Sequence, residues 1–444
     1  MGIRLSFSLL LLSSVLFNQV RGQEKLNLKQ CIEFGLKSNP SSAISQNEKR
    51  IADAKAREAL SGYLPNISFS GGVDDNLKVQ EQIIPAGLFG DQDIRVAFTK
   101  QFNTTGSLQL EQAIYDRSLI VGLKANRLVN QQAELNLQKS KETIIYNISS
   151  AYYQIFTYQQ QLELLKLNMD TYIKQLEIVS LKVQKGVALQ KDKDKVLVDY
   201  NNTLSQIRVA ETNITLAENQ LKYEMGFPMQ EKLEIEKLDT ESKEMPLDVS
   251  HDFKSENIIE HNLDQVSADL LKIEEKRILA GYLPKLSGYA RYGWNGFGDN
   301  LGQSFSTLSS FSSIGLKLIV PVFDGFKRNS QYKEAQLKYD NALQTNKLNE
   351  GKYRLEFENS VSKLFKAESN MENDRRNMEL SRSIFSVTDL QYQKGVTDMK
   401  DWLDSQNSLK EAQNSYLSSL YSYYQSKVDL EKARGTLTKF FNSL

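Results

Sequence analysis

The chain has 444 residues, of which 25% are charged and 40% are hydrophobic, and its 55 basic residues balance 55 acidic ones. A net charge near zero argues against a nucleic-acid partner, because proteins that bind nucleic acid usually carry a concentrated basic surface. With 7 prolines and 23 glycines, the chain has little material for loops, so long regular elements are expected.

The N-terminus has the pattern of a secretory signal peptide. Arg4 precedes an apolar stretch from Leu5 to Phe17, and cleavage is expected after Gly22. A membrane anchor is the alternative, but roughly thirteen apolar residues are too few to span a bilayer as a helix. We therefore predict an exported protein whose residues 1–22 form the signal peptide.

The rest of the chain consists of two similar halves. Asp116 and Gly186 are 70 positions apart, and their counterparts Asp324 and Gly395 are 71 apart. This regularity predicts a tandem duplication, far longer than the repeats of a solenoid. Four landmarks recur in the same order: 61–68 with 280–287, 115–116 with 323–324, 184–187 with 393–396, and 221–226 with 430–435. We expect a first repeat over 23–226, a linker over 227–254 and a second repeat over 255–444.

A 3.5-residue apolar period predicts long coiled-coil helices. From residue 117 to 184 the helix would be roughly 100 Å long at about 1.5 Å per residue. A helix of that length is not typical of a globular domain, and a plain fibrous coiled coil is an open alternative. Each repeat is expected to hold a helical hairpin with its tip near 186 or 395. The periodic positions are Ile144, Ile148, Ala151, Ile155, Tyr158, Leu162, Leu165, Met169, Tyr172, Leu176, Val179 and Val183, then Leu197, Tyr200, Leu204, Ile207, Ala210, Ile214, Ala217 and Leu221.

In two other segments, apolar and polar residues alternate as they do in β-strands. Ile314, Leu316 and Leu318 are separated by Gly315 and Lys317, and residues 66–73 and 286–294 also have an extended pattern. We expect two strands within about 66–115 and two within about 285–322. The first of these regions is longer, which predicts a surface loop that tolerates insertion.

Four strands cannot close a barrel, and an open sheet edge cannot lie in lipid. If the strands cross a membrane, several chains must contribute to one barrel; a small soluble sheet is the alternative. An interfacial belt of aromatic residues would fit the first case. Its members would be Tyr63, Phe69, Tyr282, Tyr289, Tyr292 and Trp294.

This duplicated pattern resembles the TolC family of outer-membrane efflux proteins over essentially the whole mature chain. The most specific match is the second hairpin tip, from Tyr392 to Leu409, and the first tip, from Gly186 to Asp192, matches likewise. The resemblance implies a mainly α protein with a β-barrel part: a homotrimer whose helical hairpins form an α-barrel in the periplasm. Its strands would contribute to a shared 12-stranded barrel in the outer membrane.

The resemblance also implies a gate at the hairpin tips. Asp401 and Asp404 lie three residues apart on one helix face, so three copies would form a ring of six carboxylates. From the residues alone, two solvated aspartates at a helix start are an open alternative. Tyr392 and Asp192 would belong to a network that holds the tips closed.

One position departs from the family pattern. Thr397 stands where many members carry a gate arginine, and nearby lysines would have to substitute. The candidate lysines are Lys191, Lys193 and Lys400.

The hairpin turns and the strand starts complete the predicted sites. Trp402, beside the acidic ring, is expected to pack within the tip, and a contact with an adaptor is the alternative. The turns, which would dock a periplasmic adaptor or serve only a conformational role, are Gly186, Val187, Gly395 and Val396. The strand starts are Tyr63, Leu64, Pro65, Tyr282, Leu283 and Pro284.

Motifs for catalysis are absent from the sequence. Its two histidines, His251 and His261, lack a ligand pattern for a metal, and there is no phosphate-binding loop or nucleophile motif. The single cysteine, Cys31, cannot form an internal disulfide and is expected to pack as a small apolar residue. We expect neither enzyme activity nor a cofactor.

The predicted function is a trimeric exit duct of a tripartite efflux or type I secretion system. It would conduct substrates passively to the exterior from an inner-membrane RND or ABC-type pump and a periplasmic adaptor, the membrane fusion protein. The alternatives are a periplasmic coiled-coil scaffold without transport and a freely open, porin-like pore. The sequence does not identify the exported substrate.

Overall fold

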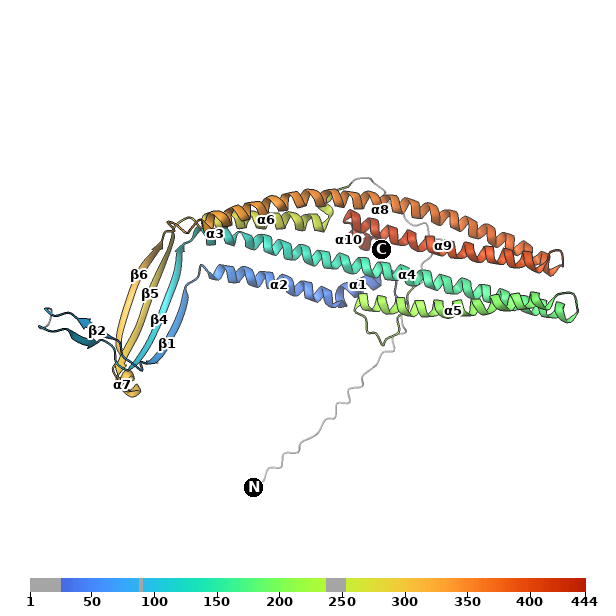
Figure 1. The fold of residues 1–444 in the computed structure, drawn as a ribbon. Helices are drawn as coiled ribbons and strands as arrows, with labels where there is room; N and C mark the ends of the chain where they lie inside the picture. Colours follow the sequence, from blue (N-terminus) through green and yellow to red (C-terminus); the bar gives the residue numbers. More distant parts are fainter. Residues whose placement is uncertain (1–24, 88–90, 237–252) are drawn as a thin grey trace, which may run out of the picture.

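The computed structural model describes residues 25–87, 91–236 and 253–444. Long helices occupy most of the length of the molecule, and a β-sheet forms one end (Figure 1). The predicted signal peptide and residues 237–252 of the predicted linker lie outside the described residues. The shorter helices are α1 (Leu28–Ser38), α2 (Pro40–Ser61), α3 (Arg117–Leu123), α6 (Ile259–Ala280), α7 (Leu301–Ser306) and α10 (Leu437–Ser443), with a 3-10 turn at Ser255–Asn257.

Two helical hairpins extend away from the sheet. The first joins α4 (Ala125–Gln184), of 60 residues, to α5 (Gln190–Met225). The second joins α8 (Lys327–Gln393), of 67 residues, to α9 (Met399–Arg434). At about 1.5 Å per residue, α4 and α8 are each about 90 to 100 Å long.

The apolar period of α4 coincides with its buried side. Ile148, Ile155, Tyr172 and Val179 are each fully buried. In α5 the predicted buried position is wrong at the start of the helix, because Leu197 is exposed and Val196 is buried instead. The buried seam of α5 follows an uninterrupted seven-residue spacing through Val196, Thr203, Ala210 and Ala217.

The sheet and the helices beneath it have the same order. Four antiparallel strands are arranged β1-β4-β5-β6, and below them α2, α4, α6 and α8 lie side by side in that order. Each strand therefore continues into the helix under it, and the wall is one layer thick. The fold class is confirmed: the chain is mainly α, with long helices and four strands in one sheet. The strands are β1 (Asn66–Asp75), β4 (Phe102–Tyr115), β5 (Lys285–Gly298) and β6 (Ser309–Ile319).

The two faces of the sheet differ in polarity because side chains alternate along each strand. One face is apolar and strongly exposed, with Ile67 at 62%, Leu316 at 70% and Ile314 at 86% of their full accessibility. A row of paired residues on this face consists of Ile67, Leu110, Ala290 and Ile314. The adjacent row on the other face consists of Ser68, Gln109, Arg291 and Ser313.

The predicted members of the aromatic belt do not all lie on one face of the sheet. Phe69, Tyr292 and Trp294 lie on the apolar face, where the rings of Phe69 and Trp294 are 6.1 Å apart. Tyr289 lies on the polar face. It is three positions from Tyr292 and five from Trp294, and side chains an odd number of positions apart on a strand point to opposite faces. An outward belt can therefore not include Tyr289.

Two small elements were not predicted. A hairpin of β2 (Glu81–Ile84) and β3 (Ile94–Ala97) extends beyond the outer end of the sheet, between β1 and β4. The six-residue helix α7 occupies the corresponding connection between β5 and β6. The additional residues of the first connection thus form a separate two-stranded unit.

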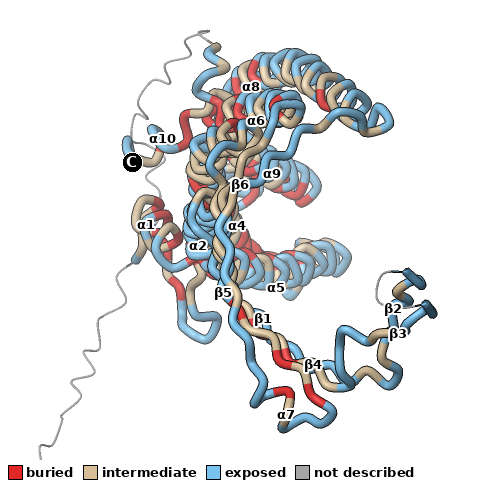
Figure 2. The backbone as a smooth tube through the Cα atoms, turned by 90° about the vertical axis from the view of Figure 1, so that its left-hand side faces the viewer, coloured by how far each residue is buried: buried red, intermediate tan, exposed pale blue. Residues whose placement is uncertain are grey.

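The main core lies halfway along the helices, where α1 and α10 pack on the outside of the wall (Figure 2). Cys31 is fully buried there, as predicted, and burial raises the pKa of its thiol to about 12. The rings of Tyr153 and Tyr424 stack 4.5 Å apart and join α4 to α9. Within the described part of the chain, no helix combines the length and the apolar character needed to cross a membrane.

Candidate functional site

The predicted site residues lie at two places: the hairpin tips and the junction between helices and sheet. The tip turns are built alike. Gly186 has φ +71° and Gly395 has φ +76°, a left-handed conformation that favours glycine. The valines that follow are 73% and 74% exposed at Val187 and Val396. Each tip thus ends in a tight turn that presents an apolar side chain outward.

The start of α9 orders the residues around the predicted acidic ring. Asp398 caps the helix, and its carboxylate accepts the backbone N–H of Asp401 at 2.9 Å. The Thr397 hydroxyl donates to Asp401 Oδ2 at 2.6 Å. Thr397, at the usual arginine position, therefore positions the Asp401 carboxylate and leaves its charge uncompensated.

Both ring aspartates face solvent. Asp401 and Asp404 are exposed on successive turns of α9, and neither forms an ion pair with any residue that the structure describes. Asp192 lies at the start of α5, where its carboxylate accepts the Leu189 N–H at 3.4 Å. Three carboxylates near the tips are consequently in a position to attract cations.

Tyr392 is the buried centre of the tip, with 4% of its surface exposed. The ammonium of Lys182, on α4, lies 3.8 Å from the ring centroid and donates to the Tyr392 carbonyl at 3.0 Å. Burial raises the pKa of the Tyr392 hydroxyl, and the negative charge of Asp192 adds to this effect. Burial lowers the pKa of Lys182. We call this contact the Lys182–Tyr392 clamp; it joins the first hairpin to the second.

The cation beside Tyr392 is Lys182, and whether Lys191, Lys193 or Lys400 substitutes for the gate arginine stays a prediction. Lys182 is four residues before Gly186, and the residue four before Gly395 is Gln391. This break in the duplication was the signal that could have identified Lys182.

An aromatic cluster supports the clamp. Trp402 is fully buried, in agreement with its predicted packing role, and its indole N–H donates to Asp389 Oδ1 at 2.7 Å. Its ring lies 6.1 Å from that of Tyr172 and 5.6 Å from that of Phe385. Because these residues come from α4, α8 and α9, the cluster fixes the two hairpins to each other at the tip.

A polar seam lies between α4 and α9 above this cluster, and sequence reasoning missed it. Asn168 donates to Gln413 Oε1 at 2.9 Å and accepts from Gln406 Nε2 at 3.3 Å, and all three residues are buried. The Tyr172 hydroxyl and Gln406 Oε1 are buried without a hydrogen-bond partner in the structure. Buried polar groups cost free energy unless they are paired. The unpaired groups of the seam therefore cost free energy where the two hairpins meet.

The strand starts are tied to the helices in two different ways. In the first repeat, the Tyr63 hydroxyl donates to the Asp116 carbonyl at 3.3 Å. The Asp116 carboxylate caps α3 and binds Lys285 at 2.8 Å. In the second repeat, Arg328 pairs with Asp324 at 3.4 Å and lies 5.9 Å from the ring of Tyr282. Leu64 and Leu283, beside the prolines, are exposed and belong to neither of the two buried apolar clusters.

Potential metal ligands do not gather in the described part of the chain. No group of three or more His, Cys, Asp or Glu side chains in the described ranges could hold a metal ion. His261 lies 2.7 Å from the Gln265 amide, within one helix.

Comparison with known proteins agrees with the geometry. Residues 276–436 match the family model described as "Outer membrane efflux protein". The chain is 21% identical over 428 residues to outer membrane protein TolC of Salmonella enteritidis, covering 93% of this chain and 82% of that protein. It is 21% identical over 437 residues to TolC of Escherichia coli strain K12, covering 93% and 83%. The crystal structure of CusC superposes with a TM-score of 0.76 at 14% identity, covering 91% of each chain.

The fold is that of outer-membrane channel subunits, with an amphipathic sheet above a wall of long helices. The chain belongs to the TolC-like family of outer membrane efflux proteins. It is an efflux channel of the outer membrane and not an enzyme. Membership of this family implies a trimeric channel.

Proposed function

We propose that three copies of this chain form the exit duct of a tripartite system and conduct substrates passively outward. The observation that carries the proposal is the sheet. Its exposed apolar face requires a lipid-like environment, and its outer strands, β1 and β6, each have one free edge among the described residues of a single chain. Backbone groups inside a bilayer must all be paired, so these edges would pair between copies. Three chains would then close one barrel of twelve strands.

The tips are the proposed gate. In a trimer the Asp401 and Asp404 carboxylates would encircle the axis at the periplasmic end. Their exposure, and the lack of ion pairs noted above, supports a ring that attracts cations and can bind a multivalent cation. Asp192 would add charge beside this ring, and the Lys182–Tyr392 clamp would hold the hairpins together in the closed state.

The hairpin turns are the proposed docking points for a periplasmic adaptor. Gly186 and Gly395 give each tip the same backbone conformation, and Val187 and Val396 offer two similar exposed apolar contacts per chain. An adaptor of the membrane fusion type would use this repetition to contact six equivalent turns in the trimer. The energy for transport would come from an inner-membrane pump of the RND or ABC type.

Planar-bilayer recording of detergent-purified protein tests this proposal. We expect small, cation-selective currents whose selectivity is lost in Asp401→Asn/Asp404→Asn. The matched control is Glu411→Gln, an exposed acidic position further along α9, which should leave selectivity unchanged. Folded trimers without any current would favour the periplasmic scaffold. A wide-open pore that the double variant does not change would keep the barrel and reject the gate.

A further inference from the structure

The apolar face of the sheet loses its large side chains near the outer end of β5. On this strand they end at Trp294, and the next two positions in phase are Gly296 and Gly298. The residue paired with Gly296 on β4 is Thr104, and the residue paired with Trp294 on β6 is Ser310. At the level of Gly296, β4 and β5 themselves therefore offer only backbone and a hydroxyl group to this face.

Helix α7 covers this bare region. A Cβ on Gly298 would lie 2.5 Å from the Ser304 backbone nitrogen, and a Cβ on Gly296 would clash with the Ser304 carbonyl oxygen. The hydroxyls of Ser304 and Thr104 are 2.7 Å apart, and both residues are buried. The helix thus lies directly on the backbone of the sheet. It lies on the apolar face, because Gly296 is in phase with Trp294.

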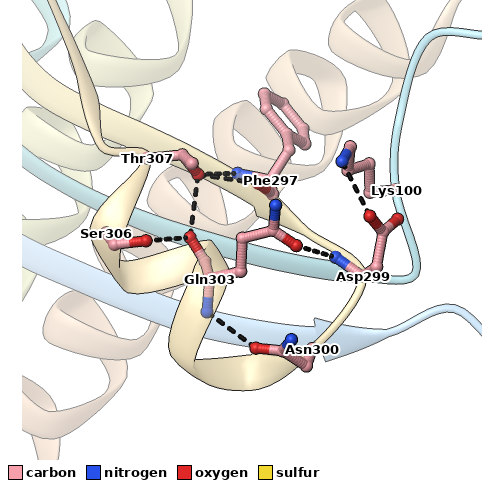
Figure 3. Close-up of polar contacts among 7 residues, drawn as sticks. All are labelled: Lys100, Phe297, Asp299, Asn300, Gln303, Ser306 and Thr307. Carbon is pink, nitrogen blue, oxygen red and sulfur yellow. Dashed lines mark hydrogen bonds and ion pairs between the residues drawn. The ribbon is translucent and has the colours of Figure 1, made fainter.

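Polar contacts fix one side of α7 to the turn and strand before it (Figure 3). The Gln303 side chain accepts the Asp299 N–H at 2.9 Å, and the Thr307 hydroxyl donates to the Phe297 carbonyl at 2.7 Å. Lys100 Nζ lies 2.8 Å from Asp299 Oδ2 and connects the same turn to the segment before β4. These contacts fix the orientation of the helix on the sheet.

The other side of α7 is apolar and exposed. Leu301 and Phe305 are four positions apart and so share one side of the helix, and Leu308 follows just beyond its end. These three side chains are 48%, 50% and 44% exposed. Leu308 also reaches over Gly296, where a Cβ would lie 3.0 Å from its methyl group. We call these three residues the α7 apolar patch; a group of this kind marks a contact surface.

The position of α7 favours lipid, and not a neighbouring copy, as the partner of this patch. The helix packs on β5 and β4, which are the central strands in the order β1-β4-β5-β6. Copies of the chain would pair through the outer strands, β1 and β6. The patch therefore lies away from the edges where copies would meet, and it continues the exposed apolar face beyond Trp294.

The length of the apolar face supports the same assignment. On β5, large side chains in phase run from Leu286 to Trp294, eight positions apart, which is roughly 27 Å along the strand at about 3.4 Å per residue. At a strand tilt of about 40° this spans roughly 21 Å, whereas the apolar band of an outer-membrane barrel is about 25 Å tall. Helix α7 covers the next two to four positions, to Gly298, and adds roughly 5 to 10 Å at the same tilt. The band is complete only with the patch.

We propose that α7 is a lipid anchor, whose apolar patch lies among the acyl chains of the outer leaflet and sets the outer limit of the membrane-spanning band. The inference rests on the trimeric channel proposed above and names a lipid contact of the same sheet. Three copies would place three anchors around one barrel. The ion pair of Lys100 and Asp299 would lie on the aqueous side of each anchor.

Spin labels in trimers reconstituted into dioleoyl phosphatidylcholine vesicles test the anchor. In a Cys31→Ala background, Phe305→Cys labels the patch and Ser306→Cys, about 100° round the same helix, is the matched control. Leu316→Cys is the reference on the apolar face, and Leu77→Cys, 94% exposed and outside the strands, is the reference for water. We expect the Phe305→Cys label to collide more with oxygen than with a water-soluble nickel chelate, as at Leu316→Cys. The Ser306→Cys label should be more accessible to nickel.

The same labels keep the two proposals apart. Access of nickel to Phe305→Cys equal to that at Leu77→Cys would overturn the anchor, and it would leave the barrel in place if Leu316→Cys still favours oxygen. Nickel access at both Phe305→Cys and Leu316→Cys would reject the membrane barrel together with the anchor. A Phe305→Cys label that neither reagent reaches would also overturn the anchor, since it would be packed against protein.

Bilayer thickness gives a second test. Leu301→Ser/Phe305→Ser shortens the apolar band, so it should lower the melting temperature of the trimer in thick dierucoyl phosphatidylcholine bilayers and leave it unchanged in thin dimyristoleoyl ones. An unchanged melting temperature in detergent would show that the variant folds. Leu77→Ser, the control, should have no effect in either lipid. An equal loss in both lipids, or no loss in either, would overturn the anchor.

Discussion

Replacing Lys182 with methionine should shift the proposed gate toward its open state. The change keeps the length of the side chain and removes the charge. The ammonium contributes a cation–π contact of about 1 kcal/mol and a charged hydrogen bond of about 1.5–3 kcal/mol. Desolvation of the lysine, which lowers its pKa, offsets part of this gain. A net loss of about 2 kcal/mol per clamp corresponds to a roughly 30-fold change in the equilibrium of one chain.

The assay is the open probability of single channels in planar bilayers. Lys182→Met should show frequent, long openings, and Lys182→Arg should remain close to the native protein because it keeps a cation over the ring. Lys185→Met is the matched control: it removes an exposed lysine at the end of the same helix. Equal effects of Lys182→Met and Lys185→Met would refute the clamp, because the change would then follow from charge alone.

Three further predictions concern stability. Gly395→Ala should lower the free energy of unfolding by about 1–2 kcal/mol, because residue 395 has a left-handed backbone conformation. Gly351→Ala, within α8 and without close neighbours, should raise the free energy of unfolding by up to about 1 kcal/mol. Equal shifts in the melting temperature of the two variants would contradict this. Asn168→Ala should lower the free energy of unfolding by about 1–3 kcal/mol, because it leaves Gln413 unpaired. Asn168→Leu/Gln413→Leu should recover most of this loss, as measured by denaturant unfolding. A double variant no more stable than the single one would count against the polar seam. Burial raises the pKa of Glu142 to about 7, so folding favours its protonated form. The contribution of this group to stability is present in full below about pH 4.5 and is lost as pH rises through 7. Glu142→Gln should therefore flatten the dependence of stability on pH between these values, by about 1 kcal/mol per chain after solvent screening; an unchanged slope would exclude this carboxyl as its source.

Local patterns were sufficient to predict the framework. The 3.5-residue period of Ile148, Ile155 and Tyr172 follows directly from the packing of one helix face, and the glycines at the tips are required by backbone conformation. The strands were predictable because alternation separates the row of Ile67 from the row of Ser68. These signals depend only on neighbours within one element.

Contacts between distant elements were not predictable in the same way. The Lys182–Tyr392 clamp and the pairing of Asn168 with Gln413 depend on which helices are neighbours, and on their relative axial position. The phase of α5 near Val196 was wrong because the turn at Gly186 resets the period. The β2–β3 hairpin has strands of only four residues, too short for a clear alternation.

The central claim is that three chains contribute to one channel. The most direct test is the mass of the smallest detergent-solubilised particle that carries ion current, measured by light scattering on the fraction used for bilayer recording. The account predicts current only from particles of three chains. Current from single chains, or protein that leaves the membrane as a soluble particle without detergent, would contradict it.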